Sequence, residues 1–523
     1  MTQVPSPTAE ENLAALDRPD HRSRRPARTL LITYACLLLL TIAFRFAVIT
    51  QPISWDVTTY ILITKQMIHG ATYYVDVWDT KPIGLFLLLM PIVAVFKNAI
   101  LAVNVCAILL ISGTALLIYV ITASVTAQQK TAGLLGAAIY VYLMASSRAF
   151  LSANAEVFFL PFVAASFYVW FRSKSPIGLF CSGLLMGVGF IIKYLVLFDF
   201  LALAVGVALL SLLQHPEARW GVRIKYLARN AVSLSAGFGI PFALIVVGYS
   251  IGGHFGEFWE ASFTVSRNYG RAIRFEDAYE FIRDRIFSES FTRIVLGFTI
   301  AVLIWDWRRW RDRLSVYCVI LWLCGSICAA IYPGRYFHHY AAQAFLPISV
   351  MMGIGLSSTV LPGRRTRIFA QVGACISIIG VAGPTIWKNY EKYYKKKNII
   401  YDVADFLRGR VGTNDYVYTA NGDHLLYLLL NTVPPTKYVH PSLAYEDEHG
   451  WVGVPPEGIL DEVFARRPKY VLVTGGFQFD PGRGEAGREE RYFRRLKSIV
   501  DGGYHLEKTF SGKREIEVFR RNE

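Results

Sequence analysis

Residues 30–48, LLITYACLLLLTIAFRFAV, form the first long apolar run of this chain, and residues 54–82, SWDVTTYILITKQMIHGATYYVDVWDTKP, follow directly on it. An apolar run of about 20 residues is long enough to cross a bilayer. The second stretch therefore holds two acids and one base, Asp56, Asp79 and Lys81, at a membrane surface among aromatic residues. Ionisable groups at that depth are costly and tend to mark a functional site. This order of segments predicts an enzyme that works at a lipid–water boundary.

The composition of the chain is typical of a membrane protein. Of its 523 residues, 54% are hydrophobic and 18% are charged, and the mean hydropathy is +0.36. Soluble proteins rarely combine these values. Residues 1–29 are polar and rich in arginine. They are expected to form a disordered cytoplasmic tail, with no cleavable signal peptide before the first apolar run.

The excess of basic residues has a topological explanation. The formal net charge is +15 at pH 7, but most Lys and Arg residues lie in short loops between apolar runs. The positive-inside bias produces this pattern without a nucleic-acid partner, so none is expected. All seven cysteines fall within apolar runs. This placement predicts neither a disulfide framework nor a zinc site with cysteine spacing.

Eleven apolar runs are candidates for membrane crossings. They span residues 30–49, 101–123, 131–147, 152–171, 177–191, 193–213, 229–251, 291–306, 314–332, 340–361 and 367–386. With a cytoplasmic N-terminus, this count places the Arg-rich loops inside, as the positive-inside rule requires. The run 83–96 is only 14 residues long and contains Pro91, so it is expected to be interfacial or re-entrant. The fold class is an α-helical polytopic membrane domain of about 11 transmembrane helices over residues 30–387.

Residues 388–523 are predicted to form a small soluble α/β domain on the outer side of the membrane. The pattern predicts helices over 401–410, 423–430, 460–466 and 489–500, an extended segment over 437–440, and strands over 415–420, 469–474, 504–510 and 515–519. No glycine fingerprint for phosphate binding is present, which favours an accessory role over catalysis. Five lysines follow the last apolar run, at 388, 392 and 395–397. On the outer side they contradict the positive-inside rule and could instead bind acidic head groups.

Four places with polar residues fall on the outer side in this topology. They are the opening loop with Asp56, Tyr60, His69, Asp79 and Lys81, the segment 148–156 with Glu156, the isolated Lys193, and the segment 333–343 with Arg335, His338, His339 and Tyr340. Because they share one side of the membrane, they can contribute to a common site. A divalent cation held by Asp56, Glu156 and a histidine stays open as an alternative.

Each candidate also has a simpler interpretation. Asp56 could cap the helix that begins beside it, and Asp79 could pair with Lys81. Lys193 could extend to the lipid head groups, although its apolar flanks favour an anionic partner. Adjacent histidines point in different directions on a helix, so at most one of the pair 338–339 is expected to face a site.

Several motifs in this order resemble a known family. They are HGATYYVDVWDTKP at 69–82, NAEVFFLP at 154–161, GVGFIIK at 187–193 and GRYFHHYAAQAFLP at 334–347. The set resembles the bacterial relatives of protein O-mannosyltransferases and lipid A aminoarabinose transferases. These are GT-C-fold, family-39-like glycosyltransferases that use polyprenyl-phosphate sugars, and the resemblance covers about residues 30–386.

The resemblance implies roles for particular residues. Asp56 matches the catalytic aspartate of the first external loop, Lys81 belongs to the Lys-Pro of that loop, and Glu156 matches an acid of the second loop. Lys193 and the segment 335–340 would match contacts to the lipid phosphate. Two positions depart from the family pattern: Val57 stands where many relatives have the second acid of an Asp-Glu doublet, and Ile83 replaces a proline. The missing doublet puts metal assistance in doubt.

The residues and the resemblance together predict an inverting glycosyltransferase of the inner membrane. Asp56 would act as the base for an acceptor hydroxyl, and Lys81, Lys193 and Arg335 would hold the departing polyprenyl phosphate. The acceptor could be a glycan, a lipid or a protein, and Glu156 would orient it or a cation.

Two other classes compete with this interpretation. A transporter or flippase for lipid-linked sugars would need repeated halves and interrupted helices, and no matching halves are visible in the sequence. An integral binding or assembly protein that uses the C-terminal domain would have an inert membrane part.

Overall fold

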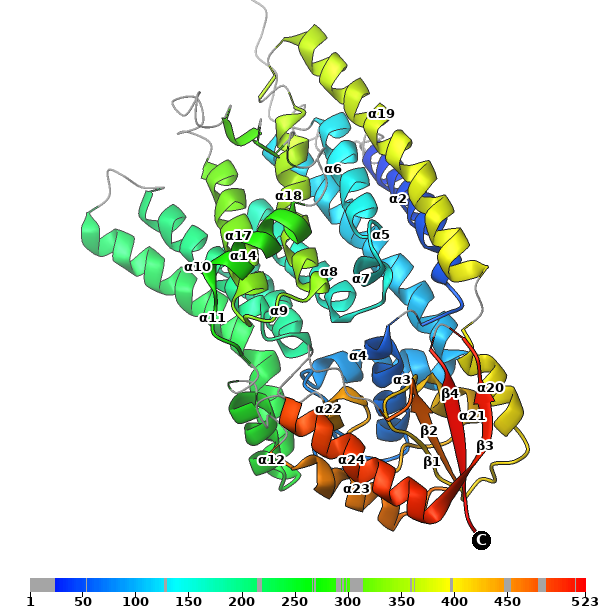
Figure 1. The fold of residues 1–523 in the computed structure, drawn as a ribbon. Coiled ribbons are helices and arrows are strands. Elements are labelled where there is room, and N and C mark those ends of the chain that lie inside the picture. Colours follow the sequence, from blue (N-terminus) through cyan, green and yellow to red (C-terminus); the bar gives the residue numbers. More distant parts are fainter. Residues whose placement is uncertain are drawn as a thin grey trace, which may run out of the picture.

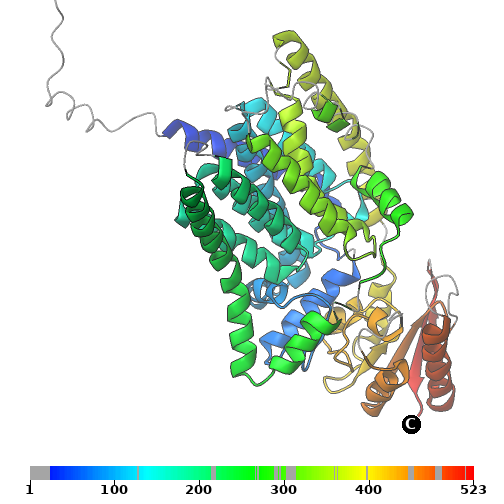
Figure 2. The same cartoon turned by 90° about the vertical axis from the view of Figure 1, so that its left-hand side faces the viewer.

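The computed structural model describes most of the chain. The described residues are 24–52, 54–126, 129–213, 219–265, 267, 270–287, 293, 296–297, 299–301, 314–357, 360–361, 363–395, 398–445, 453–477, 486–512 and 514–523. They form a long bundle of α-helices with a small C-terminal α/β domain at one end (Figures 1 and 2).

Ten of the eleven predicted apolar runs coincide with helices of the bundle. These helices are α2 (Arg24–Arg45), α5 (Ala99–Val125), α6 (Lys130–Leu143), α8 (Ala155–Arg172), α9 (Pro176–Ile192), α10 (Val196–Leu213), α11 (Trp220–Ile251), α17 (Leu314–Ile331), α18 (Ala342–Gly355) and α19 (Arg364–Asn389). The run 291–306 lies largely outside the described residues. Within the residues that the structure describes, five helical stretches are long and apolar enough to cross a membrane, and five more apolar helices are shorter. The polytopic helical class is therefore supported, whereas the number of crossings stays a prediction.

Small residues bring the helices of the bundle close together. A Cβ at Gly183 of α9 would lie 2.0 Å from the carbonyl oxygen of Leu234 of α11, and one at Gly187 would lie 2.3 Å from that of Phe238. Only glycine fits such a backbone approach. Membrane helices associate through this kind of small-residue contact, since burial of apolar surface drives little association in lipid.

Two shorter helices, α3 (Trp55–Ile68) and α4 (Gly84–Val95), lie at the end of the bundle that faces the C-terminal domain (Figure 1). At about 1.5 Å per residue, α4 is roughly 18 Å long, which is less than the thickness of a bilayer core. It also contains Pro91. The length agrees with the prediction that the run 83–96 does not cross.

The C-terminal domain has the predicted alternation of helices and strands. Its sheet has the order β1-β2-β4-β3, in which β1 and β2 are parallel and the other pairs are antiparallel. The strands are β1 (Val417–Thr419), β2 (Tyr470–Thr474), β3 (Tyr504–Phe510) and β4 (Ile516–Arg521), and the main helices are α20 (Ile400–Leu407), α21 (Leu425–Leu430), α23 (Pro456–Ala465) and α24 (Ala486–Gly503). The segment 437–440 is not part of the sheet.

That segment instead attaches the C-terminal domain to the opening loop. The backbone N–H of Trp78 donates to the carbonyl of Lys437 at 2.9 Å, and Trp78 forms an isolated parallel bridge with Tyr438. Helix α21 also packs against α3. The domain thus covers the stretch of sequence that carries Asp56.

Candidate active site

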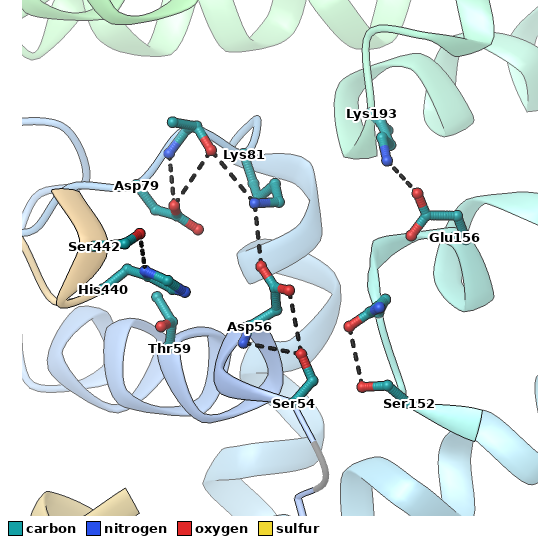
Figure 3. A network of polar contacts seen from close by, with 12 residues as sticks. Ser54, Asp56, Thr59, Asp79, Lys81, Ser152, Glu156, Lys193, His440 and Ser442 are labelled. Atoms are coloured by element: carbon teal, nitrogen blue, oxygen red, sulfur yellow. Dashed lines mark hydrogen bonds and ion pairs between the residues drawn. The ribbon is translucent and has the colours of Figure 1, made fainter. Parts of the chain in front are cut away.

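Asp56 lies in the first turn of α3, and its neighbour Ser54 caps that helix. The Ser54 hydroxyl accepts a hydrogen bond from the backbone N–H of Asp56 at 3.2 Å. The capping role considered for Asp56 therefore belongs to Ser54. The Asp56 carboxylate instead accepts from the ammonium of Lys81 at 3.4 Å (Figure 3). The simpler interpretation paired Lys81 with Asp79. In the structure Lys81 is paired with Asp56 instead.

Buried tyrosines fold the opening loop back so that Lys81 reaches Asp56. The Tyr73 hydroxyl lies within hydrogen-bonding distance of the carbonyls of Asp79 (3.0 Å) and Lys81 (2.6 Å). Tyr249 of α11 donates to the carbonyl of Tyr73 at 3.0 Å, which fastens the loop to the bundle. Tyr74 has a φ of +74°, a strained conformation for a non-glycine residue. The loop is thus held in one shape by contacts distant in sequence.

The surroundings of Asp56 stabilise its ionised form. Burial by itself would raise the pKa of this carboxyl group, but the charges of Lys81, His440 and His339 and the hydroxyl of Ser54 outweigh it. The net result is a pKa for Asp56 below the usual range of aspartates. Asp56 is therefore a carboxylate at neutral pH.

A second lysine–carboxylate pair joins α8 to α9. Glu156 lies in the first turn of α8, and its carboxylate accepts from the ammonium of Lys193, which directly follows α9. The Lys193 ammonium also lies over the ring of Tyr340, 4.1 Å from its centroid. The expected anionic partner of Lys193 is thus Glu156. The lysine does not extend to the lipid head groups.

Arg45 of α2 holds the segment that carries Glu156. Its guanidinium is buried and donates to the carbonyls of Met144 at 3.2 Å and Phe150 at 3.0 Å, and also to that of Leu151. Donation from several N–H groups of one guanidinium holds a turn in place, because a guanidinium presents its donors in one plane. No motif or pattern in the sequence marks Arg45 as part of the site.

Asp56 and Lys81 each line a different cavity. The larger one, named here the Asp56 cavity, measures about 620 Å³; it is lined by Ser54, Trp55, Asp56, Arg148, Ala149, Ser152, Asn154, His338, His339 and Arg514. The smaller one, the Lys81 cavity, measures about 160 Å³; its lining includes Lys81, Lys193, Tyr194 and Tyr340. The carboxylate thus borders one space and its ammonium partner borders the other.

Both histidines of the pair 338–339 line the Asp56 cavity, which corrects the expectation that at most one of them would face a site. They begin the short 3-10 helix η4 (His338–Ala341), in which adjacent side chains are about 120° apart. Both line the cavity because this space, about 620 Å³, extends around the turn.

The remaining predicted residues occupy the margins of the site. Tyr60 is buried beside Lys81, and the Lys81 ammonium is 5.8 Å from the centre of the Tyr60 ring. Asp79 is buried as well: one carboxylate oxygen accepts from the backbone N–H of Thr80 at 2.7 Å, and the other has no hydrogen-bond partner among the described residues. Arg335 precedes η4 but lines neither cavity. Their substrate-binding roles stay predictions.

The C-terminal domain contributes two histidines that sequence reasoning did not select. His424 is buried, and its Nε2 lies 2.8 Å from the hydroxyl of Thr59 on α3. The ring of His440 is 5.9 Å from that of Trp55, and its Nδ1 lies 2.7 Å from the hydroxyl of Ser442 (Figure 3). No motif in the domain marks these residues. Only the docking of the domain on α3 brings them to Asp56.

The residues considered for a divalent cation do not come together as ligands. Asp56 is paired with Lys81, and Glu156 with Lys193. Within the described ranges, no three His, Cys, Asp or Glu side chains form a group that could hold a metal ion. The arrangement does not fit the metal site that the sequence left open, and no cofactor is established.

Comparison with protein families supports the resemblance found in the motifs. The family model described as dolichyl-phosphate-mannose-protein mannosyltransferase matches residues 80–236. That range contains Lys81, Glu156 and Lys193 and ends inside α11. No curated protein sequence matches the chain.

Solved structures share the fold over most of the chain. ArnT from Cupriavidus metallidurans, solved bound to undecaprenyl phosphate, aligns over 93% of this chain and 97% of its own, with a TM-score of 0.58 and 11% identity. The oligosaccharyltransferase AglB from Archaeoglobus fulgidus, in complex with an inhibitory peptide and a dolichol-phosphate, aligns over 86% and 70%, with a TM-score of 0.51 and 11% identity. A second structure of the archaeal enzyme, tethered to an acceptor peptide, aligns over 94% and 74%, with a TM-score of 0.50 and 12% identity.

At this level of identity the structural matches establish the fold, which is the GT-C fold of membrane glycosyltransferases. The family-model match is independent of the structures and points to the same class. Together they support the assignment of this chain as a glycosyltransferase.

Proposed function

We propose that this protein transfers a sugar from a polyprenyl-phosphate donor to an acceptor hydroxyl, with inversion at the anomeric carbon and with Asp56 as the base. The observation that carries the proposal is the position of the Asp56–Lys81 pair. Asp56 borders the larger cavity and Lys81 the smaller one, and their charged atoms are 3.4 Å apart. A base and a phosphate-binding cation are thus adjacent, with room for a different substrate beside each.

The Lys81 cavity is the proposed site of the donor phosphate. Lys81 and Lys193 supply positive charge there, and Tyr194 and Tyr340 add hydroxyl groups and aromatic surface. ArnT and AglB, which share the fold, were solved with undecaprenyl phosphate and a dolichol-phosphate. A leaving phosphate gains negative charge as the bond to the sugar breaks, so cations fixed at this position stabilise the transition state.

The Asp56 cavity is the proposed site of the acceptor. The acceptor oxygen attacks the anomeric carbon from the side opposite the phosphate and forms the new glycosidic bond, while its proton passes to a carboxylate oxygen of Asp56. The bond between the anomeric carbon and the phosphate oxygen breaks, and polyprenyl phosphate leaves. Histidines 339 and 440, whose charges act on Asp56, would help to position this carboxylate.

Donor binding would also make Asp56 a better base. In the structure, Lys81 lowers the pKa of Asp56 by pairing with it. A donor phosphate in the Lys81 cavity competes for the same ammonium, and a weaker pair lets the pKa of the carboxyl group rise. General bases work best when their pKa approaches the operating pH, so proton abstraction would follow donor binding.

The proposed location is the inner membrane, with the site on the outer face. Eleven crossings from a cytoplasmic N-terminus put the opening loop, Glu156, Lys193 and the C-terminal domain on that side, and the Arg-rich loops on the other. The docking of the domain on α3 supports one common side for both.

The experiment that tests the function measures donor breakdown directly. Purified full-length protein in detergent is incubated with polyprenyl-phosphate sugars and an envelope extract, and free polyprenyl phosphate is quantified by mass spectrometry. Release of polyprenyl phosphate together with labelled sugar in the extract is expected. No breakdown in this assay, together with movement of intact donor across the membrane of vesicles that contain the purified protein, would instead identify a flippase and reject the proposal.

A further inference from the structure

A third cavity adjoins the Asp56 cavity, and the proposed mechanism does not use it. This space, named here the Lys388 pocket, measures about 250 Å³ and shares Arg148, Ala149 and His338 with the Asp56 cavity. Its other polar lining residues include Ser147, Lys388, Asn389 and Lys392. A molecule that reaches Asp56 through the larger cavity can therefore extend a second group into this pocket.

The pocket is positively charged. Arg148, Lys388 and Lys392 are basic side chains, and no acidic side chain among the described residues lines the space. The nearby carboxylate of Glu391 pairs with Lys395 at 2.7 Å and lies outside the lining. Like charges gathered around one concave space attract an anion, and low-dielectric walls strengthen that attraction.

Two buried donors in the pocket also lack partners. Asn389 is 7% exposed, and its side-chain Nδ2 has no hydrogen-bond partner among the described residues. The hydroxyl oxygen of Ser147 is in the same situation. Buried polar groups are nearly always hydrogen-bonded, so these two enclosed groups would gain a partner if their side chains turned toward an anion in the pocket. An amide N–H, a hydroxyl and three cations are the groups that surround the oxygens of a phosphate.

The fold holds these lysines next to the catalytic end of the bundle. Helix α19 continues into the π-helical turn η5 (Tyr390–Tyr394), which packs on the turn η1 (Phe46–Val48) that follows α2. The rings of Tyr394 and Phe46 are stacked, with centroids 5.5 Å apart. Two of the lysines that contradict the positive-inside rule therefore line a pocket beside the site, which gives them a reason to lie on that side.

We propose that the Lys388 pocket binds a phosphate group carried by the acceptor, so that the acceptor is a phosphorylated molecule whose hydroxyl reaches Asp56 while its phosphate rests between Arg148, Lys388 and Lys392. The inference rests on the proposed function, because it takes the Asp56 cavity as the place of the acceptor. It adds the chemical class of the substrate.

The test is a titration of purified full-length protein with inorganic phosphate, followed by calorimetry after the Lys81 cavity has been saturated with polyprenyl phosphate. The Lys388→Gln/Lys392→Gln variant is expected to bind phosphate about tenfold more weakly than the wild type, since two charge-assisted contacts are lost. Lys395→Gln, which removes a lysine paired outside the pocket, is the matched control and should change the affinity less than about twofold. Equal affinity in the wild type and the double variant would overturn the inference.

Competition then identifies the source of the phosphate. Displacement of inorganic phosphate by vesicles containing phosphatidic acid indicates a lipid head group, and displacement by a water-soluble sugar phosphate alone indicates a phosphorylated glycan. If neither probe displaces inorganic phosphate, the proposal of a phosphorylated acceptor is rejected. Phosphate binding requires no donor breakdown, so the two proposals can fail separately. If the enzyme is active but its affinity for phosphate does not depend on Lys388 and Lys392, only this inference is rejected.

Discussion

Two lysine–carboxylate pairs lie at the same end of the molecule and differ in what surrounds them. In the Asp56–Lys81 pair the side chains are 26% and 18% exposed, and each borders a cavity. In the Glu156–Lys193 pair they are 3% and 9% exposed, between α8 and α9. A partly exposed pair can exchange partners when a substrate arrives. A buried pair cannot, because the group left behind would be an uncompensated charge.

The difference in exposure gives the two pairs different proposed roles. The Asp56–Lys81 pair takes part in the reaction, and the Glu156–Lys193 pair holds a side chain in position. In the proposed mechanism Asp56 gives up Lys81 to a phosphate and takes a proton, because its side chain is partly exposed and borders a cavity. Glu156 instead keeps Lys193 charged and fixed in the wall of the Lys81 cavity. Similar residue pairs thus serve different purposes, and substitutions at each pair should affect different properties.

The largest effect is expected for Asp56→Asn. Removal of a general base costs about two to four orders of magnitude in rate. The initial rate of polyprenyl phosphate release should fall by this amount, while the thermal unfolding midpoint in detergent changes little because the site is partly exposed. Near-normal release by the variant would show that Asp56 is not the base.

Glu156→Gln should act on stability first. The substitution leaves Lys193 as a lone buried cation, which typically costs about 3–5 kcal/mol of folding free energy. Chemical unfolding of the purified protein measures this loss. The double variant Glu156→Gln/Lys193→Gln is the control, since it removes both charges and should recover most of the stability. If the single variant unfolds like the wild type, the contrast between the two pairs is wrong.

Lys81→Gln should move the pH dependence of the reaction. Lys81 lowers the pKa of Asp56, so its removal raises that pKa. A base works only when deprotonated, and activity is lost as the pH falls through its pKa. The acidic limb of the kcat/KM profile should therefore shift to higher pH, whereas Lys65→Gln at the other end of α3 should leave it in place. An unshifted limb in Lys81→Gln would separate this lysine from the base.

The smallest effect is expected for His440→Gln. His440 acts on Asp56 in the same direction as Lys81 but more weakly. The acidic limb should shift in the same direction by less than in Lys81→Gln, with a change in rate of only a few fold. His505→Gln, on strand β3 and exposed, provides the control. A shift as large as that of Lys81→Gln would mean that the C-terminal domain, and not the opening loop, sets the charge of Asp56.

Local patterns in the sequence predicted the helices and the strands, and they selected most residues that line the candidate site. Apolar runs mark the bundle because hydrocarbon requires continuous apolar helices, and short apolar runs such as KYVLVT at 469–474 mark buried strands. Charges in apolar surroundings, such as Asp56 and Lys193, stand out for the same energetic reason. The geometry of η4 was not predictable in this way, and both of its histidines line the cavity.

Pairing and proximity were decided by the tertiary structure. Glu156 and Lys193 are 37 residues apart, and His424 reaches Thr59 across 365 residues. No periodicity encodes such contacts, because they depend on how the loop folds over Tyr73 and where the C-terminal domain docks.

By itself, the sequence determined that the chain is a membrane-embedded helical protein and which charged residues adjoin its apolar runs. Charge is costly to bury in lipid, so the position of charged residues relative to apolar runs can be recognised from the order of residues. Only the tertiary structure decided that Asp56 holds Lys81 between two cavities, that Glu156 holds Lys193 in a buried pair, and that Lys388 and Lys392 close around a third space. These arrangements depend on packing, because a shift of a few ångströms is enough to break a contact between two charges.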